Sequence, residues 1–152
     1  MTALVLTACS STSTTSGQAA QGAEGDAGSV AVRNVVIVLG PQDSNSATVV
    51  LTAVNGSSTA DALTGVEVED TQPSSTYITG GQVALPPRQT VSVGYGGDSH
   101  VNLYDYEPAA GRLVPVTLVF RDNGRLLLSV KVVPPTGPYA SVAPSPSAAP
   151  SA

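Results

Sequence analysis

The sequence predicts an all-β protein: a single Greek-key β-sandwich, cupredoxin- or immunoglobulin-like, over residues 30–133. In several stretches of that range the large apolar side chains alternate with polar ones at a period of two, as in half-buried strands. No stretch shows the 3.6-residue period of an amphipathic helix. Turn-forming residues separate several short runs, which is the spacing typical of a sandwich. The 152 residues of the chain are enough for one domain of this kind.

The clearest local pattern is a hairpin near the end of this range. Apolar residues alternate along Val114–Arg121 and again along Arg125–Val133. Asp122-Asn123-Gly124 separates the two runs. Because Asn-Gly tolerates positive φ, this sequence predicts a tight turn between two antiparallel strands.

Five further strands are predicted upstream of this hairpin. Two turn sequences separate some of them, Asn55-Gly56-Ser57-Ser58 and Pro86-Pro87. The predicted strands are Val32–Leu39, Ala47–Val54, Ala62–Glu69, Thr90–Tyr95 and Ser99–Tyr104.

The N-terminus indicates a lipoprotein. Leu6-Thr7-Ala8-Cys9 has the form of a bacterial lipobox, so residues 1–9 are interpreted as a signal peptide and Cys9 as the lipid attachment site. No basic residue precedes Cys9 and the apolar run is short, so we expect the true start to lie upstream. Acylation, for example with palmitate, would anchor the protein at the extracytoplasmic face of the cell membrane.

The segments that flank the domain have low complexity. Residues 10–29 carry no large apolar side chain and predict a flexible spacer, and residues 134–152 predict a disordered tail rich in Pro, Ser and Ala. Five of the six basic residues are Arg, which together with the abundant Ala, Gly and Val suggests a GC-rich genome and an actinobacterial source.

Composition excludes several functions. The formal net charge of -5 argues against binding nucleic acid through a basic face. A single Cys rules out an internal disulfide and a zinc site made of several cysteines. Gly97-Asp98-Ser99-His100 resembles the Gly-Asp-Ser opening of some serine esterases, but the only His lies beside the Ser and cannot serve as its distant base. We therefore predict that the protein is not an enzyme.

His100 is the one candidate metal ligand. If Val101 and Leu103 point into the core, His100 and Asn102 lie on the outer face. His100 is then either a surface side chain hydrogen-bonded to Asp98 or water, or a weak Cu(II) or Zn(II) ligand that acts with Asp98 or Asp105.

The domain resembles the PCu(A)C family of periplasmic copper chaperones. Leu51-Thr-Ala-Val-Asn55 and Asp61-Ala-Leu-Thr-Gly-Val66 are similar to its N-terminal part. Its C-terminal part is matched by Leu85-Pro-Pro, Val91-Ser-Val, Gly96-Gly97, His100-Val-Asn-Leu103, Gly111, Val114–Phe120 and the closing strand to Val133. The resemblance implies a site in which two Met and two His bind Cu(I), with His100 in the His-x-Met pair.

Most of that implied ligand set is missing here. Asn102 stands where the Met should be, and residues 70–81 contain neither Met nor His. We therefore expect a lipid-anchored binding or interaction module without a cofactor, whose metal site is degenerate and whose partner is an envelope protein. The alternative is a copper-handling lipoprotein that uses an altered site around His100.

Overall fold

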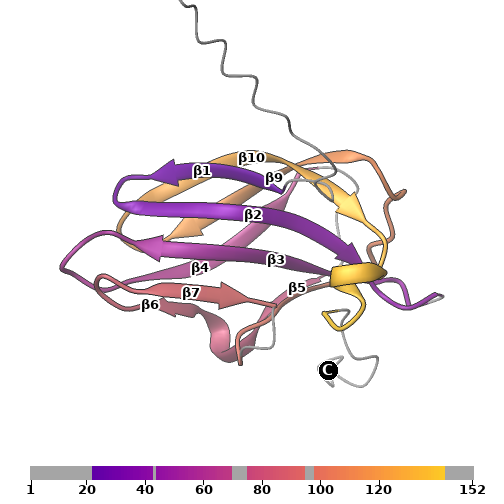
Figure 1. The fold of residues 1–152 in the computed structure, drawn as a ribbon, viewed down its shortest axis with the longest axis horizontal. Helices are drawn as coiled ribbons and strands as arrows, with labels where there is room; N and C mark the ends of the chain where they lie inside the picture. Colours follow the sequence, from indigo (N-terminus) through magenta and orange to yellow (C-terminus); the bar gives the residue numbers. More distant parts are fainter. Residues whose placement is uncertain (1–21, 43, 70–74, 95–97, 143–152) are drawn as a thin grey trace, which may run out of the picture.

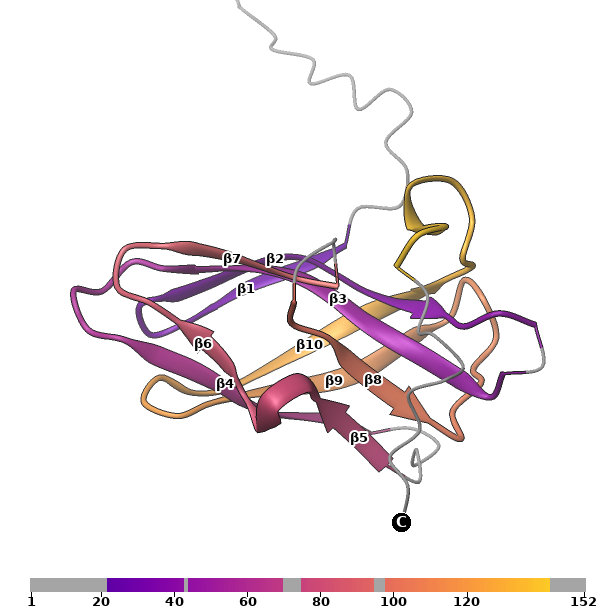
Figure 2. The same cartoon turned by 90° about the horizontal axis from the view of Figure 1, so that it is seen from below.

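The chain forms two layers of antiparallel strands that belong to one nearly closed sheet (Figures 1 and 2). The computed structural model describes residues 22–42, 44–69, 75–94 and 98–142. The strand order is β5-β8-β3-β2-β10-β9-β4-β6, with β1 paired to β2 and β7 paired to β3. The strands are β1 Ala23–Ala27, β2 Val30–Leu39, β3 Ser46–Asn55, β4 Asp61–Val68, β5 Ser75–Ile78, β6 Val83–Leu85, β7 Thr90–Val93, β8 Val101–Tyr104, β9 Leu113–Phe120 and β10 Gly124–Val133.

The predicted fold class is confirmed, and all seven predicted strands are present with both ends within two residues of the predicted ones. Two short 3₁₀ helices, η1 Thr79–Gly81 and η2 Gly137–Tyr139, are the helical elements among the described residues. No helix in the described ranges has the length and apolar character needed to cross a membrane.

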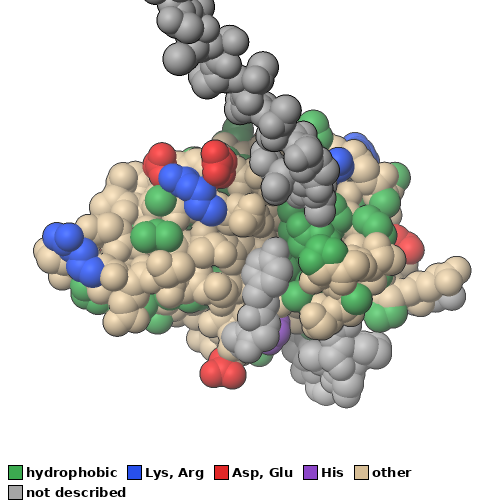
Figure 3. Space-filling model, in the orientation of Figure 1, with side chains coloured by type: hydrophobic (Ala, Val, Ile, Leu, Met, Phe, Trp, Pro, Cys, Tyr) green, Lys and Arg blue, Asp and Glu red, His purple; other side chains and the backbone are tan. Residues whose placement is uncertain are grey.

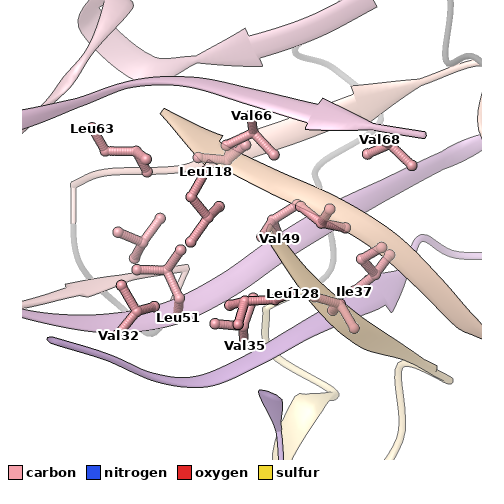
Figure 4. Packing of buried hydrophobic residues seen from close by; sticks show 14 of the residues in the cluster. Val32, Val35, Ile37, Val49, Leu51, Leu63, Val66, Val68, Leu118 and Leu128 are labelled. Carbon is pink, nitrogen blue, oxygen red and sulfur yellow. The ribbon is translucent and has the colours of Figure 1, made fainter. Parts of the chain in front are cut away.

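Alternate side chains of both layers meet in one aliphatic core (Figure 4). Val130 and Val132 from β10 and Val116 and Leu118 from β9 are buried, as the period-two pattern predicts. Burial of such side chains is the main favourable term in folding. The core residues labelled in Figure 4 are Val32, Val35, Ile37, Val49, Leu51, Leu63, Val66, Val68, Leu118 and Leu128.

The predicted hairpin is confirmed, with a longer turn than the two-residue form. Phe120 pairs with Gly124, so Arg121, Asp122 and Asn123 form a three-residue loop. Gly124 takes φ +81° directly after this loop, a left-handed conformation that glycine adopts without steric cost.

A buried carboxylate organises this turn. Asp61, 3% exposed at the start of β4, accepts hydrogen bonds from the backbone N–H of Ala62 (2.7 Å) and Asp122 (2.9 Å). It also accepts from the backbone N–H of Asn123 at 3.3 Å and from its Nδ2 at 2.6 Å. Asn123 Oδ1 in turn accepts from the backbone N–H of Ser29 at 2.9 Å. One network thus ties β4, the β9–β10 turn and the β1–β2 turn together.

The prediction of a flexible spacer over residues 10–29 is wrong for its last part. Ala23–Ala27 forms β1, antiparallel to β2. Arg33 Nη1 donates to the carbonyl of Gly25 (3.2 Å) and to Asp26 Oδ1 (3.3 Å). A Cβ on Gly25 would lie 3.0 Å from Leu128 Cδ2, so the glycine allows β1 to pack closely on the core. The rest of the predicted spacer lies outside the described residues, as does the predicted signal peptide with Cys9.

The prediction of a disordered tail over residues 134–152 is likewise wrong for its first part. The segment 134–142 folds through η2 and buries Val142, which is 6% exposed. Val142 and Tyr139 pack on the outer face of the sheet against Val36, Val38, Val50 and Val133. The sheet is therefore apolar on both faces at this place, and the chain covers the outer face with its own C-terminal segment.

We predict that Asp61→Asn makes the protein less stable at neutral pH and removes part of its acid sensitivity. Burial alone would raise the pKa of Asp61, but hydrogen bonds from the Asn123 side chain and from the N–H groups of Ala62, Asp122 and Asn123 together lower it below its usual value of 3.8. The native carboxylate therefore stabilises the fold above about pH 4, and this contribution disappears as the pH falls through the lowered native pKa. We expect a loss of roughly 1–3 kcal/mol at pH 7.

Urea unfolding between pH 2 and pH 7 measures this effect. Asp122→Asn is the matched control, because Asp122 is exposed in the same turn and contributes its backbone N–H rather than its carboxylate to the network. An Asp61→Asn protein with wild-type stability at both ends of the pH range would contradict the prediction.

Candidate functional site

His100 lies between the two strands, β7 and β8, that pair with the same edge of β3. β7 and β8 both pair with β3, β7 along Leu51–Val54 and β8 along Ser46–Val49. Residues 94–100 connect these two strands, and His100 lies directly before the start of β8. The histidine surface is visible near the lower centre of Figure 3, so the imidazole reaches the surface of this face.

Backbone contacts fix this connection at both ends. Gly94 N–H donates to the carbonyl of Ser99 (3.0 Å), which closes the loop. Gly94 takes φ +81°, and a Cβ there would lie only 2.9 Å from Val50 Cγ2, so both conformation and space require glycine. The carbonyl of His100 accepts from Thr79 N–H at 3.0 Å, which ties the residue to η1. The His100 backbone is thus held, while its side chain is half-buried.

Asn102 is directed to the outer face, as predicted, but it is buried there. Its neighbours Val101 and Leu103 are fully buried in the main core, whereas Asn102 lies opposite Thr48 of β3 on the other face. Asn102 Oδ1 accepts a hydrogen bond from Thr48 Oγ1 at 3.0 Å, and the two residues are 7% and 0% exposed. The sequence analysis did not identify Thr48. The register that places it beside Asn102 depends on strands 54 residues apart in sequence.

These two residues belong to a row that crosses the outer face of the sheet. The row runs from Val133 on β10 to Val38 on β2, Thr48 on β3, Asn102 on β8 and Tyr77 on β5. It is apolar at the β10 end, where the C-terminal segment covers it. It is polar at Thr48 and Asn102, and it ends at a tyrosine that is 40% exposed.

The other predicted ligand residues do not form a metal cluster with His100. Asp98 and Asp105 are both exposed, and Asp105 takes φ +53° in the turn after β8. Within the described ranges, no group of three or more His, Cys, Asp and Glu residues could hold a metal ion. The predicted pairing of His100 with Asp98 or Asp105 therefore lacks a third ligand of these types among the described residues. Residues 70–74 and 95–97, which flank this region in sequence, lie outside them.

Comparison with known proteins identifies the family of the domain. A family model described as "Putative lipoprotein LpqE-like" matches residues 30–132. The chain belongs to the LpqE-like family. No curated protein matches its sequence.

Solved structures place this LpqE-like chain beside PCuAC domains. It is 25% identical to the "Copper-bound PCuAC domain from PmoF2", with a TM-score of 0.64 over 74% of this chain and 98% of that one. It is also 25% identical to the "Apo PCuAC domain from PmoF1", with a TM-score of 0.65 over 74% and 99% of the two chains. The resemblance to the PCu(A)C family inferred from the sequence is confirmed.

We predict that Thr48 and Asn102 are strongly coupled. Thr48→Val leaves the buried Asn102 amide without its donor and should lower the free energy of unfolding by roughly 1–3 kcal/mol. Adding Asn102→Leu to Thr48→Val removes both polar groups, so the double variant should recover much of that loss.

A double-mutant cycle by urea unfolding measures the coupling. Thr52→Val on the same strand is the control, because Thr52 is half-exposed and should tolerate the change. Additive effects of the two substitutions would show that the hydrogen bond does not link the residues.

Proposed function

We propose that this LpqE-like chain is a lipid-anchored interaction module of the cell envelope, built on a PCuAC-type domain whose metal site is degenerate. It acts on the extracytoplasmic side of the membrane by binding an envelope protein, without catalysis and without a resident cofactor.

One observation carries the proposal: the hydrogen bond between Asn102 and Thr48. In the resemblance to PCu(A)C proteins, Asn102 stands at the Met of the His-x-Met pair. Its amide oxygen is a hard donor, whereas Cu(I) prefers soft thioether and thiolate sulfur. The buried Thr48 hydroxyl already donates to that oxygen. The side chain therefore stabilises the sheet, and binding a metal there would cost this hydrogen bond.

The other residues of the chain that could bind copper are also poorly suited to a tight site. The only Met is Met1, within the predicted signal peptide, and His100 is the only His of the chain. A single imidazole with water or carboxylates gives a weak and unselective site. The absence of a suitable ligand set supports a role in which the domain binds another protein through its surface.

A second candidate, copper handling at an altered site around His100, is favoured by one observation. The side chain of His100 is half-buried, and its backbone carbonyl is held by the N–H of Thr79. One of the similar PCuAC structures is a copper-bound form. In this alternative Cu(II) is bound by His100, with further ligands from a partner subunit.

We predict that the protein does not compete for Cu(I) with a strong chromophoric chelator. The assay uses the full chain with Cys9→Ser, because a free thiol would itself bind Cu(I). His100→Ala in the same background should give an identical curve, and the pair is measured again with Cu(II). Copper withdrawn from the chelator by the parent and not by His100→Ala would overturn the degenerate-site proposal and establish the second candidate.

The lipid anchor is supported by the lipobox Leu6–Cys9 and by the family description. The cysteine thiol would carry a diacylglycerol through a thioether, and two or three acyl chains would give stable attachment where one is marginal.

We predict that the chain, expressed in a bacterial host behind a full lipoprotein leader ending at Cys9, fractionates with membranes. Mass spectrometry should find the mature N-terminus at Cys9 with the added mass of its acyl chains. Cys9→Ala should abolish both results, whereas Ser10→Ala should change neither. An unmodified Cys9 in membrane-extracted protein would exclude the anchor.

A further inference from the structure

A second apolar cluster lies on the outer face of the sheet, apart from the main core. Its sheet residues are outward-facing valines of β2, β3 and β10, here called the valine patch: Val36, Val38, Val50 and Val133. The strand registers make them direct neighbours, because Val36 pairs with Val50 and Val38 pairs with Val133. Val133 is 5% exposed and the other three are 0% exposed. The patch is therefore continuous and almost completely covered.

The valine patch is covered by the segment 134–142, here called the strap. Val142, 6% exposed, and the half-buried Tyr139 are the strap side chains that belong to this cluster. A contiguous apolar surface of this kind, if left open, is typical of an interaction site. The strap therefore occupies a surface that could bind something else.

The backbone of the strap is not part of the sheet. Pro134 directly follows the last residue of β10 and has no N–H to donate to a neighbouring strand. The backbone hydrogen bonds described for the strap join its own residues. Tyr139 N–H donates to the carbonyl of Thr136 at 3.1 Å, and Val142 N–H donates to the carbonyl of Tyr139 at 3.2 Å. The strap can therefore leave the sheet without breaking any backbone hydrogen bond described between the two.

The contacts of the strap are also separate from the main core. The main core lies between the two layers, whereas the valine patch and the strap pack on the outer face. The strap also lies beyond residues 30–132, which the family model matches. Two apolar side chains attach the whole segment, and the conformational entropy of its backbone opposes that attachment. A segment held by so few buried contacts opens at a lower free energy than the domain unfolds.

We propose that the strap is an autoinhibitory cover, which opens while the domain stays folded and which, when closed, keeps other ligands from the valine patch. The open state presents the patch next to Thr48, which pairs with Val38. A ligand for this surface binds only the open state, so its apparent affinity is reduced by the fraction of molecules that are open. The inference goes beyond the proposed function, because it requires neither the lipid anchor nor a metal.

Thiol labelling of the full chain tests the proposal. Cys9→Ser removes the only cysteine. One valine at a time is then replaced: Val142→Cys in the strap, Val36→Cys beneath it, or Val49→Cys in the main core as the control. The rate of reaction with a maleimide is measured against urea concentration. The urea unfolding curve of each variant gives the rate expected if labelling required global unfolding.

The Val142→Cys and Val36→Cys proteins should react at least about tenfold faster than global unfolding allows, with little dependence on urea, because opening the strap exposes little surface. The Val49→Cys protein should react only through global unfolding. If all of these proteins react at the rate of global unfolding, the proposal is overturned. Reaction of the Val142→Cys protein without that of the Val36→Cys protein would also overturn it, since the strap would then fray without uncovering the patch.

A charge placed in the strap gives the sharper test. Val142→Asp should hold the strap open, because the closed state would bury a carboxylate among valines. With this change, the Val36→Cys protein should react nearly as fast as one with an exposed thiol, and at least about tenfold faster than the Val49→Cys protein. Ser141→Asp, a change at the exposed neighbouring residue, should leave the Val36→Cys rate unaltered. If Val142→Asp leaves the Val36→Cys rate unaltered, or makes the Val36→Cys and Val49→Cys proteins react equally fast, the strap does not open by itself and the proposal is wrong.

Discussion

The parallel pairing of β10 with β2 is the contact on which the rest of the architecture depends. It joins the last strand of the domain to its second strand, through Lys131–Val133 and Val36–Val38. These strands belong to different layers, so the pairing connects the layers into one sheet and encloses the aliphatic core between them. The chain has one Cys and therefore no internal disulfide. Burial of this core and the continuous strand pairing supply the stability.

The position of the candidate site follows from the pairing of β3 with both β7 and β8 along one of its edges. β3 pairs with β2 along one side, and β7 and β8 divide the other side between them. The division places His100 directly before β8, where its backbone is held by Thr79 and its side chain is half-buried. A site of this kind needs ligands of suitable chemistry on adjacent strands. The side chains at this place are Thr48 of β3 and Asn102 of β8, and they form a hydrogen bond with each other.

The two layers of the sheet differ in whether the apolar side chains on their outer faces are covered. On the β2–β3 side the outward valines are covered by the C-terminal segment, whose described backbone hydrogen bonds close within that segment. On the β9–β10 side Leu113 and Leu127 are left exposed to solvent. Among the described residues, one apolar region of the outer face is thus covered by the chain itself, and other large aliphatic side chains remain exposed. This asymmetry is consistent with the interaction role proposed for the domain.

The sequence by itself determined the fold class and most strand positions, because several runs alternate at a period of two, as in Leu126–Val132, and turn-forming residues separate the runs. It also determined the hairpin turn, since Asn123-Gly124 acts locally. The existence of β1 was determined only by the tertiary structure. Ala23–Ala27 has little strand propensity and is held in place by Arg33 and by the edge of β2. Burial of Val142 and the bond from Thr48 to Asn102 were decided in the same way. Each joins residues far apart in the chain, and local patterns carry no information on which distant strand will lie alongside.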